Sequence, residues 1–98
     1  MLCALSSRKL KPGAWEGFRK AWQPPEFPPG FVRAYHVRAV DDESHVVSFG
    51  LLEGSAADMD RVREDMASGE DERQSRMAEF VESTQLDGIF EVIEEVTP

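Results

Sequence analysis

The sequence has 98 residues but only one cysteine, two histidines and no asparagine. The single cysteine, Cys3, cannot form a disulfide within the chain, and on a strand such a residue is usually a small buried apolar side chain. No apolar run approaches the ~20 residues that a membrane-spanning helix requires, so we expect no membrane partner. The first residues lack the basic-then-apolar order of a signal peptide, and we expect a cytoplasmic protein.

The sequence also lacks the short motifs of several enzyme classes. It contains no G-x-S-x-G, no P-loop and no G-x-G-x-x-G, so nothing indicates acyl transfer or nucleotide binding. If Asp42 and Glu43 centre a turn, His36 lies ~13 Å along the hairpin from the level of His45, at ~3.3 Å per residue. Because metal–nitrogen bonds are only ~2 Å long, we expect no metal site, and we also expect no cofactor.

Positive charge is scarce in the second part of the chain. The net charge is −8, with a balance of +5 over residues 1–40 and −13 over residues 41–98. This acidic total argues against nucleic acid as a partner. The asymmetry has two interpretations: Arg8 and Lys9 pair with an acidic C-terminal strand, or a basic patch steers an anionic ligand.

The centre of the sequence predicts a β-hairpin. Residues 31–40 and 45–52 have strand composition, and the polar residues 41–44 between them are typical of a turn. Apolar residues occur in both alternating sets of side chains, whereas a sheet packed on one face should alternate cleanly. We therefore expect a second copy of the chain to cover the second face.

The remaining segments complete the predicted fold, and the length predicts a single domain over residues 1–98. The order strand–helix–strand–strand–helix–strand indicates an α+β, ferredoxin-like βαββαβ fold. We expect a four-stranded antiparallel sheet, in the order fourth–first–third–second strand, with the helices on one face. The outer elements are a strand at 1–10, a helix at 12–22, a helix from Ser55, a break at 67–71, a helical piece at 72–83 and a strand at 86–97.

Three aromatic residues share one face of the first predicted helix. Trp15, Phe18 and Trp22 are spaced i, i+3, i+7. They either pack as core against the sheet or form the wall of a flat apolar pocket. The proline-rich residues 23–30 that follow should form a stiff, extended connection at the rim of such a pocket.

Two neighbouring residues of the second predicted strand have side chains suited to acid–base chemistry. His36 can titrate near neutral pH and act as a base toward a phenol. Tyr35 can donate a hydrogen bond to a carbonyl or a developing oxyanion. Adjacent strand residues point to opposite faces, so both can line one cavity only if a bulge intervenes.

Two stretches joined by the acidic turn carry a family resemblance. PPGFVRAYHVR (28–38) and HVVSFGLLEGSAADMDRVRED (45–65) resemble the antibiotic biosynthesis monooxygenase family of the dimeric α+β barrel superfamily. The resemblance implies a homodimer whose two sheets form a barrel, with a ligand cleft between sheet and helices. The characterised oxygenases of this superfamily act on polycyclic aromatic substrates, or on haem, without a metal or flavin of their own.

The residues that this resemblance implies for the site differ in this chain. The family site has an asparagine on the first strand and a tryptophan near the start of the second helix. Here Ser6 or Ser7 stands in the first-strand region, Leu52 ends the third strand where tryptophan is common, and Arg61 lies in the helix region. No histidine follows His45, which disfavours haem cleavage, because the haem-degrading members use a histidine on that helix.

Our leading hypothesis is a homodimeric, cofactor-independent monooxygenase of an aromatic or polyphenolic small molecule. Trp15, Phe18, Trp22 and Tyr35 would lie at the ligand pocket, and His36 would be the base. Two alternatives stay open, because a fold does not determine a reaction. The same dimer could bind a small molecule as a non-catalytic or regulatory module, or the fold could carry isomerase or lactone chemistry.

Overall fold

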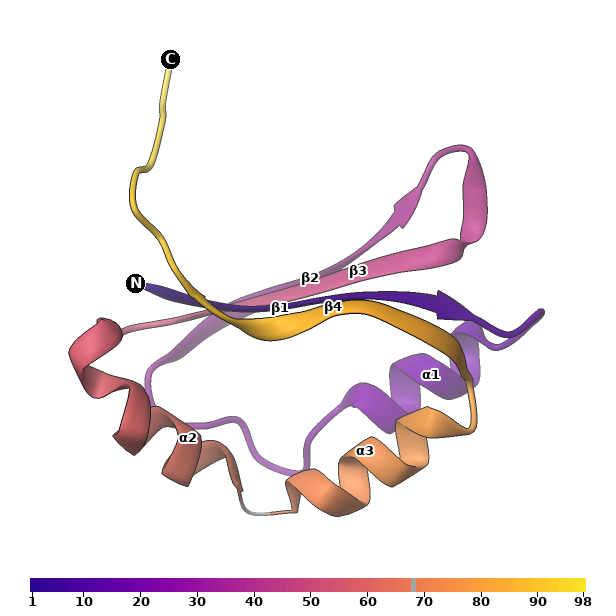
Figure 1. Ribbon diagram of the computed structural model, residues 1–98, viewed down its shortest axis with the longest axis horizontal. Helices are drawn as coiled ribbons and strands as arrows, with labels where there is room; N and C mark the ends of the chain where they lie inside the picture. Colours follow the sequence, from indigo (N-terminus) through magenta and orange to yellow (C-terminus); the bar gives the residue numbers. More distant parts are fainter. Residues whose placement is uncertain (68) are drawn as a thin grey trace.

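The computed structural model describes residues 1–67 and 69–98 and has four strands and three α-helices within them. A short 3₁₀ turn precedes the second helix (Figure 1). The elements are β1 (Leu2–Leu10), α1 (Trp15–Trp22), β2 (Phe31–Ala39), β3 (Asp42–Leu52), the 3₁₀ turn (Ala56–Asp58), α2 (Met59–Ala67), α3 (Glu70–Ala78) and β4 (Val81–Glu91).

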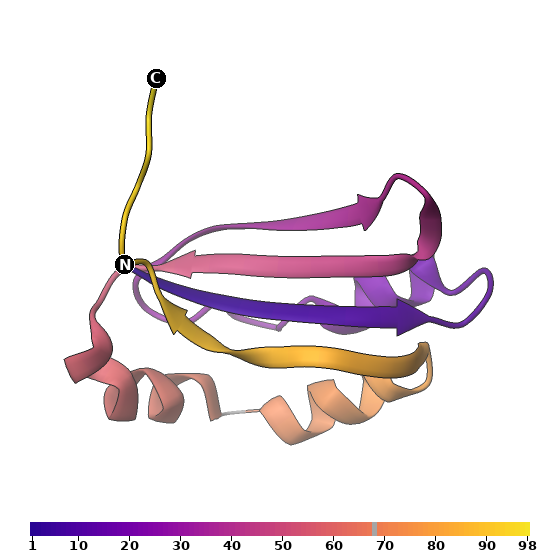
Figure 2. The same cartoon turned by 45° about the horizontal axis from the view of Figure 1, so that its top comes forward.

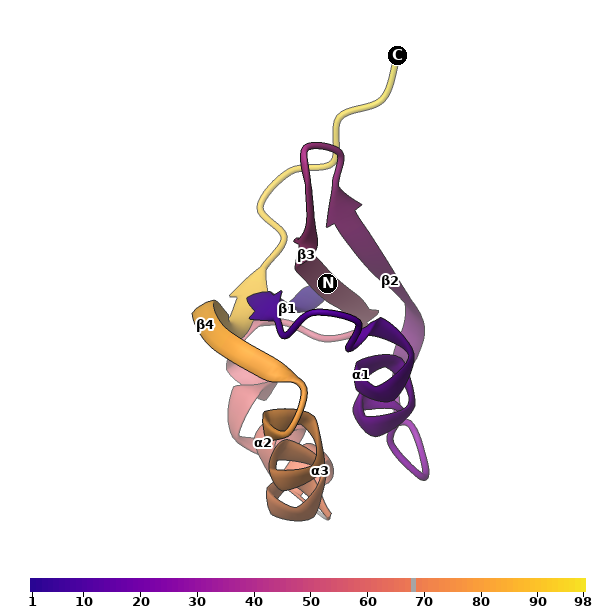
Figure 3. The same cartoon turned by 90° about the vertical axis from the view of Figure 1, so that its right-hand side faces the viewer.

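The strands form one antiparallel sheet in the order β2-β3-β1-β4 (Figure 2). All three helices lie against the same face of this sheet (Figure 3). The predicted βαββαβ fold, the strand order and the placement of the helices are therefore confirmed. None of the helices in the described residues is long and apolar enough to cross a membrane.

The last strand differs most from the prediction. β4 begins at Val81 rather than Leu86 and ends at Glu91. Asp87 and Gly88, expected to form its entry turn, instead pair with Ser6 and its neighbour in the middle of β1. β4 is an edge strand, and such a strand can leave many of its side chains in solvent. Its first residues are polar, so the sequence shows no alternation of apolar residues that would mark the start of the strand.

The helix ends also differ from the prediction. α1 begins at Trp15 because Gly13 has φ of +70°, which ends the regular backbone before it. α3 runs over Glu70–Ala78 rather than 72–83. The predicted break at 67–71 contains Gly69, whose φ is +74°, while Ser68 lies outside the described residues. The capping arrangement at Ser55 is present, because its backbone N–H donates to Asp58 Oδ2 at 2.8 Å.

Two apolar clusters hold the helices on the sheet, one near each end of β1. Burying each large apolar side chain contributes about 1.5–3 kcal/mol. Between the clusters, the middle of the covered face carries polar side chains instead. The first cluster contains Leu10, Phe18, Ala21, Val46 and Met77. The second contains Leu2, Leu52 and Val62, and Met59 and Met66 of the predicted α2 stripe pack against it. The buried polar residues are Ser6, Arg8 and Ser48.

The helices of the described residues leave the other face of the sheet uncovered, and apolar side chains lie at its centre (Figure 3). Tyr35 is 48% exposed, and its ring packs on Phe49 with the centroids 5.3 Å apart. Leu86 and Phe90 of β4 are exposed to a similar degree. The last residues, 92–98, leave the sheet away from the helices (Figure 1). We call this surface the open face.

Candidate ligand pocket

A cavity of about 270 Å³ lies between the middle of the sheet and the helices. Side chains of β1, β3 and β4 form its floor, and its walls come from the end of α1, the proline-rich segment, α2 and α3. This volume is near the lower end of small-molecule sites, which measure ~300–1,000 Å³. The cavity is therefore of a size for a compact organic molecule.

The sequence keeps this space open with small residues on the floor and a stiff rim. Ala4 and Gly50 line the floor, and a Cβ added at Gly50 would meet Phe31 Cε2 at 3.6 Å, an ordinary contact distance. A larger side chain there would thus enter the cavity. On the rim, Phe27 stacks on Phe31 with the ring centroids 4.2 Å apart, between prolines that fix the backbone φ.

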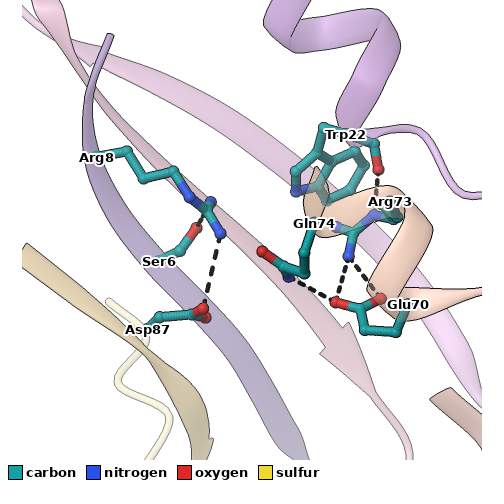
Figure 4. Close-up of polar contacts among 7 residues, drawn as sticks. All are labelled: Ser6, Arg8, Trp22, Glu70, Arg73, Gln74 and Asp87. Carbon is teal, nitrogen blue, oxygen red and sulfur yellow. Dashed lines mark hydrogen bonds and ion pairs between the residues drawn. The ribbon is translucent and has the colours of Figure 1, made fainter. Parts of the chain in front are cut away.

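The polar part of the floor centres on Arg8, which is only 5% exposed. Its guanidinium donates a hydrogen bond to Ser6 Oγ and lies 3.8 Å from Asp87 Oδ2 (Figure 4). It also lies over the ring of Phe18, 5.8 Å from the centroid. Burial lowers the pKa of Arg8, and the charge of Asp87 opposes this effect. Arg8 nevertheless remains a cation at neutral pH.

A second arginine joins two helices above the cavity. Arg73 Nε donates to the backbone carbonyl of Trp22 at 2.6 Å, and Nη1 donates to both carboxylate oxygens of Glu70 at 2.8 Å (Figure 4). The guanidinium also lies over the Trp22 ring, 5.3 Å from its centroid. These contacts tie α3 to the end of α1 and fix the indole of Trp22 at the cavity.

His36 lies beside the cavity rather than in its lining. Its Nδ1 shares a hydrogen bond of 2.7 Å with the hydroxyl of Ser48, which does line the cavity. The imidazole meets the rings of Trp15, Phe18 and Trp22 edge-on, at 5.4, 6.0 and 4.5 Å between centroids. Burial lowers the pKa of His36, and nearby arginines lower it further, so the ring is neutral at neutral pH.

The structure separates the site residues that the sequence suggested. Trp22 lines the cavity, whereas Phe18 is fully buried in the first apolar cluster. Trp15 packs against that cluster and beside a smaller hollow of about 160 Å³ that it shares with His36. Tyr35 lies on the open face, so any contact it makes with a ligand would be there and not in the main cavity.

Arg8 and Ser48 at the cavity floor were missed as candidate site residues. A signal was present, because Leu2, Ala4 and Leu10 belong to one alternating set of β1 side chains that Ser6 and Arg8 interrupt. A charged residue on the buried parity of a strand is expensive unless it has a partner or a task. The interruption therefore could have marked the site.

No three His, Cys, Asp or Glu side chains within residues 1–67 and 69–98 are grouped so that they could hold a metal ion. The two histidines lie on opposite faces of the sheet. His45 Nε2 shares a hydrogen bond of 2.7 Å with Ser7 Oγ, whereas His36 binds Ser48 on the helix-covered face.

The chain matches no protein-family model and no curated protein by sequence. Among solved structures, it is similar to a "putative antibiotic biosynthesis monooxygenase" of Chloroflexus aurantiacus, with a TM-score of 0.68, 5% identity, and coverage of 98% of this chain and 96% of that one. A protein of the same description from Nitrosomonas europaea has a TM-score of 0.64 and 16% identity, covering 96% and 100%.

A third similar structure is SnoaB, a cofactor-independent oxygenase from Streptomyces nogalater. Its TM-score is 0.65 and its identity 12%, with coverage of 99% of this chain and 97% of that one. The resemblance seen in the sequence is therefore confirmed in the fold: this chain has the fold of the antibiotic biosynthesis monooxygenase-like structures.

Proposed function

We propose that the protein is a homodimer that binds a flat aromatic molecule in its cavity and oxidises it with dioxygen, without a cofactor. The observation that carries this proposal is the aromatic wall of the cavity. Trp22, Phe27 and Phe31 all line it, and aromatic side chains favour aromatic ligands through offset and edge-on contacts. The fold shared with SnoaB, described as a cofactor-independent oxygenase, supports the reaction class.

The proposed reaction converts a phenol ring into a quinone. One atom of dioxygen becomes the new carbonyl oxygen, and the other leaves as water with the two hydrogens that the phenol loses. Dioxygen is the only oxidant. The protein has to bind the ring, exclude bulk water and accept the phenol proton at the start of the reaction.

His36 is the proposed base, acting through the hydroxyl of Ser48. The 2.7 Å hydrogen bond connects the imidazole to a hydroxyl in the cavity lining, and the lowered pKa keeps the imidazole able to accept a proton at neutral pH. The indoles of Trp15 and Trp22 pack against the His36 imidazole and hold its orientation.

The two tryptophans provide a matched pair for testing the pocket. Trp22 lines the cavity and Trp15 does not. Trp15→Phe leaves Trp22 as the only tryptophan, and Trp22→Phe leaves Trp15. Titration with 1-nitronaphthalene, a neutral and non-fluorescent quencher, should give a saturable curve with wild-type affinity in the Trp15→Phe protein and a several-fold weaker affinity in the Trp22→Phe protein. Equal affinity of the two variants would overturn the pocket assignment.

Oxygen uptake tests the reaction. With 1,5-dihydroxynaphthalene, the protein should consume one dioxygen per quinone formed, and His36→Gln should lose most of that rate while retaining the 1-nitronaphthalene response. A specific observation favours the alternative of a non-catalytic binding module: His36 packs among three aromatic rings and does not line the cavity, which its hydrogen bond reaches through Ser48. Ligand binding without oxygen uptake would support that alternative.

A further inference from the structure

The cavity contains a buried cation that the protein itself satisfies only in part. A guanidinium has five N–H donors. Among the described residues, that of Arg8 makes one hydrogen bond, to Ser6 Oγ, and its other polar contact is Asp87 Oδ2 at 3.8 Å. This distance is beyond a hydrogen bond. Arg8 therefore has unused hydrogen-bonding capacity at the floor of the cavity.

The comparison with Arg73 shows that this is a property of Arg8 and not of the cavity as a whole. Arg73 donates to both oxygens of Glu70 and to the carbonyl of Trp22 at 2.6–2.8 Å. Figure 4 shows the two groups of contacts side by side, with Gln74 between them. Glu70 is thus already engaged, since it also accepts from Gln74 at 2.7 Å.

The acidic residues around the cavity do not compensate Arg8 well. Asp65 and Glu26 also line the cavity, but Asp65 lies 3.7 Å from Arg61, and Glu70 pairs with Arg73. Asp87 faces Arg8, but its side chain is 55% exposed, whereas that of Arg8 is 6% exposed. Water screens an exposed carboxylate, so it stabilises a buried cation only weakly.

We propose that the ligand is an aromatic carboxylate, with its carboxylate bound by the guanidinium of Arg8 and its ring against Trp22. This inference rests on the proposed aromatic pocket and narrows its ligand class. The planar fork of arginine matches the two oxygens of a carboxylate, and the guanidinium of Arg8 lines the same cavity as the indole of Trp22. Asp87 then competes with the ligand for Arg8 and limits its affinity.

The test uses isothermal titration calorimetry with two probes of the same shape, 2-naphthoate and the neutral 2-naphthamide. We expect the wild-type protein to bind naphthoate at least about tenfold more tightly than naphthamide. Arg8→Met should abolish this preference, and it should fold, because the Asp87 carboxylate that loses its partner is 55% exposed and stays hydrated. Arg8→Lys, which keeps the charge but not the fork, should retain only part of the preference.

Two further variants make the result specific. Asp87→Asn should tighten naphthoate binding several-fold and leave naphthamide binding unchanged. Arg19→Met removes the same charge from an exposed position on α1, where Arg19 pairs with Glu16, and should preserve the wild-type preference. Loss of preference in Arg19→Met would indicate long-range charge rather than contact with Arg8, and would overturn the proposal.

The outcomes separate this inference from the proposed function. If naphthamide binds as tightly as naphthoate, the aromatic pocket stands and the carboxylate assignment fails. If neither probe gives heat at millimolar concentration and the Trp22 fluorescence is also unresponsive, the pocket proposal fails and this inference fails with it. If the preference for naphthoate survives Arg8→Met, the carboxylate is bound elsewhere, and the role assigned to Arg8 fails while the aromatic pocket stands.

Discussion

At the centre of the sheet, the two faces reverse the usual distribution of polar and apolar side chains. In β3, Ser48 points toward the helices and is 3% exposed, while its neighbours Val47 and Phe49 point to the open face. The centre of the covered face holds Ser6 and Arg8, both buried. Polar groups are thus enclosed where a simple core would be apolar, and apolar groups face water on the other side.

This reversal suggests a different task for each face. Buried polar groups cost free energy unless they are paired, so a protein gains little from them except at a site that binds a ligand. A large exposed apolar surface is likewise unusual on a monomer and typical of an interface. The covered face is the candidate ligand site, and the open face is the proposed dimer interface.

The largest expected effect comes from a charge on the open face. Phe49 lies on a central strand, opposite Leu5 and Tyr35, and Phe49→Asp should convert a dimer into a monomer in light scattering at micromolar concentration. A dimer that persists at micromolar concentration has at least about 8 kcal/mol of association free energy.

Val40→Asp is the matched control for this change. Val40 is fully exposed at the hairpin turn and lies outside the sheet surface, so its replacement should leave the mass unchanged. A wild-type protein that is already monomeric at this concentration would contradict the assignment of the open face to a second copy.

A smaller effect should distinguish a core phenylalanine from an interface phenylalanine. Phe18 is fully buried, and Phe18→Ala should lower the free energy of unfolding by about 3–5 kcal/mol at any protein concentration. Phe90 is 45% exposed on the open face, and Phe90→Ala should cost stability only where the dimer forms. Urea unfolding in the wild-type and Phe49→Asp backgrounds measures both.

The result for Phe90 decides between two explanations of its exposure. If Phe90→Ala costs the same in the dimeric and monomeric backgrounds, Phe90 stabilises the subunit itself and the open face is only an apolar surface. A cost confined to the dimeric background makes Phe90 part of the interface.

Most of the fold could be predicted from the sequence, because local signals agree with one another. The aromatic spacing of α1 and the Met59–Val62–Met66 stripe of α2 lie where the pattern placed them. The central hairpin is also present, but its turn lies at residues 40–41 rather than 41–44, and β3 begins at Asp42 rather than His45. β4 was placed too late, because its first residues are polar and its pairing with β1 depends on a partner distant in sequence.

The candidate site was harder to predict because it depends on the register of the hairpin. A turn centred on Asp42 and Glu43 would pair His36 with Phe49, whereas the structure pairs His36 with Ser48. The chain turns at Val40 and Asp41 instead, and the irregularity between Arg38 and Ala39 then shifts the pairing, which leaves a net difference of one residue from the expected register. A register shift of one residue gives every side chain of the strand a different partner on the neighbouring strand. The His36–Ser48 contact therefore could not be inferred from composition.

The smallest expected effect is the pH dependence of stability that His36 adds on the covered face. Its pKa in the folded protein is lowered, mainly by burial, so the unfolded chain takes up a proton more readily. The unfolded imidazole titrates near pH 6.5. Stability should therefore be complete above this pH and should fall as the pH decreases through 6.5 toward the lowered pKa of the folded state.

Urea midpoints at pH 7.5 and 5.5 measure this effect, and the two histidines again allow the faces to be compared. His36→Gln keeps a hydrogen-bonding group near Ser48 but cannot titrate, so the loss of stability at pH 5.5 should become smaller than in the wild type. His45→Gln removes the imidazole that contacts Ser7 on the other face and serves as the control. If His45→Gln, and not His36→Gln, reduces the pH dependence, the enclosed imidazole is not its source.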